Sequence, residues 1–442
     1  MIRPLNAMTE QTAHIATLKV VHLNASSAGG AFVAAQRLSQ ALSQTDHIES
    51  SHWVFEGGEG DFYLWADQWL KKKWAFGLHA FEKLDFLRYE REKSVRFAFS
   101  HGKTGVNVSA WKSIQEADVI HLHWVNKGFV SLQGLKDLLL LNKRVVWTCH
   151  DMWPFTGGCY HPRGCDHFTN TCGNCHYLKS PSDADLSRRV FSAKQALYSN
   201  SGTNLTFVTP SQWLKDQALK SGALTNALRD GIQVIPNPID TDYFHPKATQ
   251  PVGSAKPFVL MFAAANLGNV AKGFDGFRWV CNELVARGFT QVEALIVGEN
   301  RIGNLGLNCQ YRELGFIKDA EQMREAYWQA DVYVTTSLEE NLPTTIMESL
   351  SCGVPVAALA VGGIPEMLVA SGEHQTGFLV PKSGVGLVTT DNYMEQLVQE
   401  LSDYIVAPQS QVHHIKQNSR TFALQHYSAR QIALAYERVY RS

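Results

Sequence analysis

The sequence carries almost no net charge and has no long apolar run. Its formal net charge is −1 over 442 residues, of which 18% are charged, so no global charge favours nucleic acid or an acidic partner. No stretch reaches the roughly 18 uncharged apolar residues of a membrane-spanning helix. Residues 1–17 are polar and mixed, and they lack the apolar core of a signal peptide. We therefore expect a cytoplasmic protein that binds no nucleic acid.

Several motifs are also missing. No glycine fingerprint of the Gly-x-Gly-x-x-Gly type follows a predicted strand, which argues against a dinucleotide-binding domain. No Asp-x-Asp triplet stands where it would hold a catalytic divalent cation, and no repeat of fixed period indicates a solenoid. What remains is an ordinary globular composition, 45% hydrophobic, in a chain long enough for two or three domains.

Short apolar runs alternate with helical patterns along the first half of the chain. Residues 18–25, "LKVVHLNA", have the pattern of a buried strand, and "SSAGGAFVAAQRLSQAL" follows with two glycines and an apolar stripe of helical period. Further strands are expected in "ADVIHLHWV", "RVVWTCHD", "NLTFVTP" and "IQVIPN". This order predicts βα units and a parallel sheet.

A proline-rich connector at residues 236–246 interrupts this pattern, which then starts again. The second half offers the strands "KPFVLMFAAAN", "VEALIVGEN" and "DVYVTTS", with helical segments between them. We expect a boundary near residues 240–255 and two doubly wound α/β domains, 1–245 and 246–425. Ligands of such sheets bind beyond the carboxyl ends of the strands, in a cleft between domains.

The segment "SLEENLPTTIMESLSCGVPV", residues 337–356, joins a predicted strand to a predicted helix. Pro343 near the first helical position leaves the amides of Thr344 and Thr345 free, and such amides suit a phosphate. Glu340 could accept hydrogen bonds from sugar hydroxyls, and Glu348 could reach a ribose diol. The alternative is a surface helix with an acidic start, which the helix dipole also favours.

Lysine and glycine residues next to other predicted helices could border the same cleft. Lys272 in "NVAKGFDGF" could neutralise a diphosphate, although a solvated lysine at a helix start is the ordinary alternative. Gly362 and Gly363 in "AVGGIPEML" would let the backbone approach a ligand closely. Gly29 and Gly30 form a second glycine-rich turn, in the first domain.

These motifs together resemble the family 4 retaining glycosyltransferases of GT-B fold, with two Rossmann-like domains facing across a cleft. The resemblance lies in the early "GG", the "HD" after "VVWTC", the "KGF", the two glutamates separated by seven residues, and "GGIPE". "HLHWVNKGFVSL", "VVWTCHDMWPFTGGCYH", "CGNC" and "VTPSQWL" resemble a bacterial subgroup acting in exopolysaccharide, colanic-acid-like and O-antigen (lipopolysaccharide) assembly. The resemblance covers the chain from about residue 20 to its end.

The resemblance implies roles for individual residues. Glu340 is expected at the donor sugar's hydroxyls, Glu348 at the nucleotide ribose and Lys272 at the diphosphate. Further donor contacts are expected from the His150 side chain beside the sugar and from the backbone at Gly29, Gly30, Asn341, Leu342, Thr344 and Thr345. The tail helix, about residues 426–442, is expected to cross back onto the first, acceptor-side domain, and residues 246–425 to bind the nucleotide sugar.

The implied activity is retaining transfer of a sugar from a UDP- or GDP-sugar to a growing surface polysaccharide or lipid-linked glycan, with no cofactor required. The alternatives are a catalytically degenerate GT-B scaffold protein and a GT-B nucleotide-sugar epimerase. The sequence departs from the family in "ANLGNVAKG", which lacks the usual arginine five residues before Lys272, so Arg301 is considered as a substitute cation. The family's "EGFGLP" also becomes "ENLPTT".

Four of the eight cysteines gather in "GGCYHPRGCDHFTNTCGNCHYL". Cysteine pairs at this spacing favour a tetrahedral Zn²⁺ site, and a reducing compartment disfavours disulfides. We expect a structural zinc on Cys159, Cys165, Cys172 and Cys175, with disulfides, free thiols or an iron–sulfur cluster as alternatives. The neighbouring histidines His161, His167 and His176 are substitute ligands.

Residues 65–99 combine aromatic residues with lysines and arginines, in a segment that predicts a basic amphipathic helix. Such a helix can lie on an anionic membrane, here the inner membrane, which would suit a lipid-linked acceptor. Acidic residues are interleaved, so we expect instead a solvated helix whose apolar stripe faces the core. His121 and His123 alternate along a strand like a metal pair, but we expect one in the core and the other near the cleft.

Overall fold

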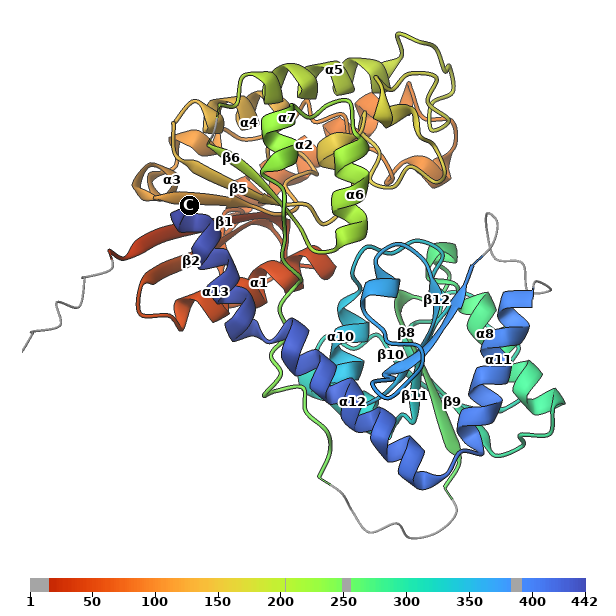
Figure 1. The fold of residues 1–442 in the computed structure, drawn as a ribbon. Coiled ribbons are helices and arrows are strands. Elements are labelled where there is room, and N and C mark those ends of the chain that lie inside the picture. The colour runs from red at the N-terminus through yellow and green to blue at the C-terminus, as the bar shows by residue number, and fades with distance from the viewer. Residues whose placement is uncertain (1–15, 203, 249–255, 383–391) are drawn as a thin grey trace, which may run out of the picture.

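The computed structural model describes residues 16–202, 204–248, 256–382 and 392–442, and it contains two parallel β-sheets (Figure 1). The first sheet has seven strands in the order β3-β2-β1-β4-β5-β6-β7, and the second has six in the order β10-β9-β8-β11-β12-β13. In each sheet the strand order reverses direction, with strands added on both sides of a central one. The prediction of two doubly wound α/β domains is confirmed.

Five of the seven strands of the first sheet form in the predicted apolar runs, whereas β2 and β3 were not predicted. β1 is buried over most of its length, as expected for a strand covered on both faces. The strands of this sheet are β1 (Leu18–Ser26), β2 (Ile48–Glu56), β3 (Tyr63–Leu64), β4 (Val119–Leu122), β5 (Arg144–Thr148), β6 (Leu205–Thr209) and β7 (Gln233–Val234). The helices of this half are α1 (Gly30–Ser43), α2 (Trp69–Leu87), α3 (Lys112–Glu116), α4 (Leu132–Leu139), α5 (Leu186–Ser199), α6 (Gln212–Lys220) and α7 (Asn226–Asp230).

The second sheet has its own apolar core, which is a separate cluster of buried residues. Its strands are β8 (Phe258–Asn266), β9 (Val292–Glu299), β10 (Gln310–Gly315), β11 (Val332–Thr335), β12 (Val356–Ala360) and β13 (Gly377–Pro381). The helices that follow in the chain are α8 (Phe274–Ala286), α9 (Ala320–Gln329), α10 (Thr344–Ser351), α11 (Asn392–Ile405), α12 (Gln409–Tyr427) and α13 (Ala429–Arg441). Part of the expected boundary, residues 249–255, lies outside the described residues.

The chain passes between the two halves at two places that are hydrogen-bonded to each other. The amide of Ile239 donates to the carbonyl of Tyr427 (2.8 Å), and the amide of Ala429 donates to the carbonyl of Ile239 (3.0 Å). Beyond Ser428, α13 leaves α12 and packs beside α1 of the first half (Figure 1). Ile432 and Tyr436 of α13 belong to a core cluster with residues of the first sheet.

Helix α2 does not follow the sequence-based expectation, because its large apolar side chains face outward. Leu70, Trp74, Phe81 and Leu84 are 59–71% exposed. Their spacing places them along one stripe of the helix. The expectation that this stripe lies in the core is therefore wrong.

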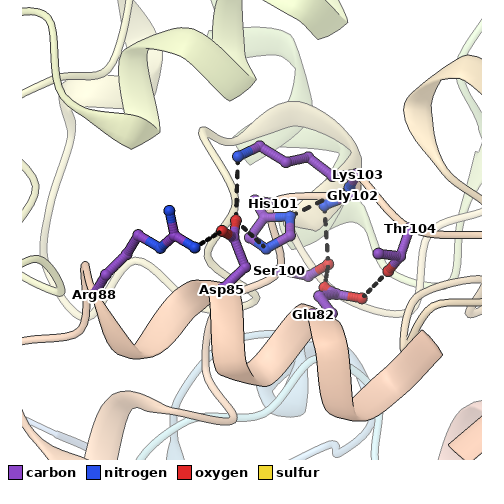
Figure 2. Close-up of polar contacts among 8 residues, drawn as sticks. All are labelled: Glu82, Asp85, Arg88, Ser100, His101, Gly102, Lys103 and Thr104. Carbon is purple, nitrogen blue, oxygen red and sulfur yellow. Dashed lines mark hydrogen bonds and ion pairs between the residues drawn. The ribbon is translucent and has the colours of Figure 1, made fainter. Parts of the chain in front are cut away.

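The inward side of α2 is instead held by carboxylates (Figure 2). Glu82 is 2% exposed and accepts hydrogen bonds from the hydroxyls of Ser100 and Thr104. Asp85 accepts a hydrogen bond from Lys103 (3.2 Å). Both buried acids find hydrogen-bond partners on the 100–104 loop, so they fix which side of α2 faces inward, and this leaves the apolar stripe outside.

Candidate functional site

A cleft of about 610 Å³ lies between the two halves and is lined by residues from both. This volume is typical of small-molecule sites. The first half contributes Phe32, Arg37 and Phe62, and the second contributes Thr344, Thr345 and Glu348 among others. A larger cavity of about 1290 Å³ lies beside α13 and includes none of the predicted site residues.

The N-terminus of α10 opens onto this cleft. Pro343 is the residue before the helix, and no side chain caps the first turn, so the first amides are available to a ligand. Tyr333 donates a hydrogen bond to the hydroxyl of Thr345 (3.1 Å), which fixes that side chain against the end of the sheet. The helix start therefore has the geometry that phosphate-binding helix termini use.

Glu348 is buried, and its carboxylate is paired across the cleft. One oxygen accepts from Arg37 of α1 (2.7 Å) and the other accepts from the hydroxyl of Tyr327 (3.1 Å). Sequence reasoning missed Arg37, although it is the only basic residue of α1. A ribose diol that used Glu348 would have to exchange with the guanidinium of Arg37.

Lys272 and Glu340 form a direct ion pair, with 2.6 Å between the Lys272 Nζ and a carboxylate oxygen of Glu340. Lys272 ends a short 3₁₀ turn, and Gly273 follows in the left-handed conformation (φ 72°). A Cβ at Gly273 would lie 2.0 Å from the carbonyl oxygen of Thr336, so only glycine lets this turn pack against the end of β11. The close packing brings the lysine to the loop that carries Glu340.

The glycines of "GGIPE" pack closely against a neighbouring loop, and their approach to a ligand stays a prediction. A Cβ at Gly362 would lie 1.6 Å from the carbonyl oxygen of Glu340, and one at Gly363 would lie 2.1 Å from that of Asn341. These glycines therefore allow close packing of the 362–363 loop against the 340–341 loop, where a ligand had been expected.

Glu366 of the same motif links the two halves, although sequence reasoning gave it no role. Its carboxylate accepts hydrogen bonds from the amides of Gln212 and Trp213, both at 2.6 Å, at the start of α6. An acidic side chain at that position also suits the helix dipole.

The first half supplies Gly29, Gly30 and His150. Gly29 has φ 90° and precedes α1 without a side-chain cap, and both glycines are exposed with open space around them. The backbone carbonyl of His150 accepts a hydrogen bond from the side chain of Asn341 (3.2 Å). Asn341 also accepts from the hydroxyl of Ser211 (2.7 Å), so it is tied to the first half by both ends of its amide.

Two further predictions on the second half can be placed. The backbone carbonyl of Leu342 is 3.5 Å from the side-chain amide of Asn237. Arg301 is ion-paired with Glu299 (2.6 Å), and both side chains are at least half exposed. The substitute cation is therefore held at the surface by its own partner.

The four clustered cysteines are free thiols around one small cavity of about 20 Å³, which has room for a single ion- or water-sized particle. His176 also lines this cavity, and its Nε2 is buried without a partner among the described residues. In the structure, the four sulfur atoms do not converge on one point. Within the described ranges, the only trio of ligand atoms closer than 4.8 Å to one another belongs to His22, His121 and His123.

Comparison with known proteins identifies the class. A model described as Glycosyltransferase Family 4 matches residues 28–243, and one described as Glycosyl transferases group 1 matches residues 257–403. The structure of Anabaena HepE with UDP and glucose superposes with TM-score 0.57 at 16% identity, covering 96% of this chain and 100% of that one. The structure of WaaG, a glycosyltransferase involved in lipopolysaccharide biosynthesis, gives TM-score 0.56 at 12% identity, covering 95% and 99%. The fold is that of the GT-B glycosyltransferases.

The chain belongs to the family 4 glycosyltransferases. It is 26% identical over 270 residues to the putative colanic acid biosynthesis glycosyl transferase WcaC of Escherichia coli, covering 58% of this chain and 61% of that protein. It is 28% identical over 224 residues to the gpi3 subunit of a phosphatidylinositol N-acetylglucosaminyltransferase of Schizosaccharomyces pombe, covering 48% and 43%. The matched region thus spans less than two thirds of either relative. Among the described helices, none is long and apolar enough to cross a bilayer.

Proposed function

We propose that this protein transfers a sugar from a UDP- or GDP-sugar, with retention of configuration, to a growing surface polysaccharide or lipid-linked glycan. The observation that carries the proposal is the grouping of the uncapped α10 terminus with Glu348 in one cleft, beside the pair of Lys272 and Glu340. The UDP-bound HepE structure supports a nucleotide-sugar donor. The colanic acid relative supports a polysaccharide acceptor.

In this mechanism the breaking bond joins the sugar to the diphosphate. The transition state is oxocarbenium-like, and negative charge grows on the leaving diphosphate. Lys272 and the amides of Thr344 and Thr345 stabilise that charge, since fixed cations and amide dipoles act where the charge develops. Glu340 orients Lys272 and accepts hydrogen bonds from the sugar. The leaving phosphate takes the acceptor's proton, so no protein nucleophile and no cofactor is required.

The acceptor side would face a lipid surface through α2. Exposed apolar side chains on one stripe of this helix suit the acyl boundary of a membrane. Lys71, Lys72 and Lys73 follow directly on its first turn, and Lys73 lies over the exposed ring of Trp69 at 4.7 Å. Interleaved cations and aromatic rings favour anionic lipids. An acceptor on a lipid carrier would then meet the cleft from the membrane.

The cysteine loop would hold a structural zinc ion. Cys159, Cys165, Cys172 and Cys175 line one ion-sized cavity, and thiolates are preferred zinc ligands. The turn at Cys172 has φ 52°, so the chain curls back on itself between the last two cysteines. Metal binding would require side-chain rotation to bring the sulfurs together, and it would then fasten the loop that follows His150.

A thermal-shift panel of nucleotides and nucleotide sugars, followed by a transfer assay, tests the proposed function. UDP or GDP compounds should raise the melting temperature of the wild type by mass action. Lys272→Ala should abolish this shift, whereas Lys112→Ala, which removes a lysine at an exposed surface site, should leave it unchanged.

The same experiment separates the alternatives. A shift with no transfer but with conversion of the free nucleotide sugar would indicate an epimerase. No shift with any nucleotide would indicate a degenerate scaffold, and the missing arginine would then explain the loss.

A further inference from the structure

Three histidines form a continuous hydrogen-bonded row that leads from the core of the first sheet to His150, whose backbone carbonyl contacts Asn341 of the second half. The Nδ1 of His22 on β1 lies 3.0 Å from the Nε2 of His123, which directly follows β4. The Nδ1 of His123 lies 3.1 Å from the Nε2 of His150, which follows β5. We call these residues the histidine row.

The rings of the histidine row meet edge to edge. The ring centroids are 5.3 Å apart for His22 and His123 and 5.4 Å apart for His123 and His150, with interplanar angles of 20° and 26°. At these nitrogen–nitrogen distances, the centroids of two imidazole rings cannot lie much farther apart than this. The nitrogens therefore lie on the line between the centroids, so the N–H of one ring points along the lone pair of the next.

All three rings are neutral near pH 7. Burial lowers the pKa of His150 to about 4 and the pKa values of His22 and His123 well below their usual range. A neutral imidazole donates with one nitrogen and accepts with the other. The histidine row must then run head to tail, with one direction of donation throughout.

The buried end sets that direction. The Nε2 of His22 is buried and has no partner among the described residues. A bare acceptor costs less there than an unpaired N–H, because buried orphan N–H groups are the rarer and costlier case. His22 therefore carries its proton on Nδ1 and donates to His123, which donates in turn to the Nε2 of His150. The remaining proton of His150 is on Nδ1.

Neighbouring groups leave this direction in place. Both ring nitrogens of His121 are engaged by hydroxyls, Nδ1 with Tyr440 (2.7 Å) and Nε2 with Thr148 (2.8 Å). His52 stands beside His22 across the sheet, and its ring nitrogens have no partner among the described residues. His150 itself is only partly buried, and no residue of the described chain is bonded to its Nδ1, so that nitrogen is available to a ligand.

We propose that His22 and His123 are positioning residues that hold His150 as the Nδ1–H tautomer, so that a neutral imidazole donates a hydrogen bond to an oxygen of the bound donor sugar. This inference rests on the proposed function for the identity of the ligand. The tautomer itself is a property of the free protein.

Nitrogen-15 NMR of histidine-labelled protein tests the tautomer directly at pH 7. The wild type should show His150 protonated at Nδ1 and bare at Nε2. His123→Leu should abolish this preference and lower kcat by about 10- to 100-fold with little change in the donor KM. His123→Gln should restore much of both, because its amide can accept from His22 and donate to His150.

His52→Leu is the matched control, since it removes a buried histidine ring from the same sheet but outside the histidine row. It should leave the His150 signals and kcat near wild type. Protonation of wild-type His150 at Nε2 would overturn the proposal. So would an equal loss of kcat in His52→Leu and His123→Leu, or stoichiometric metal bound through His22, His121 and His123. If His150 is protonated at Nδ1 but the protein binds no nucleotide, the tautomer assignment stands and only the proposed function is refuted.

Discussion

The two sides of the candidate site are built from different chemistry, and we call the side with Lys272 and Glu340 the charged wall. The second half presents charged groups that are already paired, Lys272 with Glu340 and Glu348 with Arg37 from the opposite wall. The first half contributes Arg37 to one of these pairs, and it also carries the neutral imidazole of His150. If the proposed function holds, we expect the charged pairs to stabilise the leaving group and His150 to orient the uncharged sugar.

Removing the cation of the charged wall should have the largest effect. Lys272→Ala deletes the basic group beside Glu340 and should lower kcat by about 100- to 1,000-fold, as loss of a charge-stabilising group in a transition state does. Steady-state kinetics with the donor identified by thermal shift would measure this. Lys112→Ala should remain near wild type. Near-normal turnover in Lys272→Ala would remove the basis for assigning the leaving group to this wall.

Acid should destabilise the first half, which holds several buried histidines. Burial lowers the pKa of His52 from 6.5 to about 4. Between pH 6.5 and pH 4, His52 is therefore protonated in the unfolded chain but neutral in the folded one. Stability is then constant above pH 6.5 and falls as the pH drops towards 4, by about 3 kcal/mol for such a ring. Urea unfolding followed by tryptophan fluorescence should show this fall, and His52→Leu should make it shallower. An unchanged midpoint between pH 7 and pH 5 would contradict the expectation.

The cysteine loop of the first half offers a further contrast with the charged wall. Cys172→Ser should abolish one equivalent of zinc and lower the melting temperature by about 5 °C, since loss of a metal ligand costs a few kcal/mol. Metal analysis and calorimetry would measure both. Cys309→Ser, at a part-exposed cysteine of the second half, should keep the zinc. Zinc-free wild-type protein of unchanged stability would refute the site.

The smallest effect is expected at the outer surface of the first half. The double variant Leu70→Ser and Trp74→Ser should weaken binding to vesicles of anionic lipid by about 10-fold, since each change removes exposed apolar surface. Co-sedimentation at low salt would measure this. Leu140→Ser, at another exposed leucine (66%), is the control. Equal binding of all three proteins would argue against α2 as the membrane contact.

Several strands were predictable because parallel strands buried on both faces read as continuous apolar runs, whereas β2, β3, β10 and β13 were not predicted. β1, β5 and β8 form in segments that were expected to be strands. The orientation of α2 was not predictable, because its inward side depends on Glu82 and Asp85 meeting a loop more than ten residues away in the chain. A pattern of apolar residues does not reveal that a carboxylate has a buried partner.

The candidate site shows the same limit. Lys272 and Glu340 each lie near the end of a predicted strand. Both could therefore be predicted as site residues from the sequence. Arg37 was missed because its role depends on a contact across the two halves. The histidine row was missed because it depends on the register between β1 and β4. His22 pairs with His121 in that register, and His123 lies two residues further along the chain.

The paired crossings at Ile239 and Ser428 limit how the two halves can move. Two hydrogen bonds hold the crossing segments side by side. We therefore expect movements of one half relative to the other to turn about this joint. The ion pair between Arg37 and Glu348 also joins the two halves, and a nucleotide whose ribose bound Glu348 would break it.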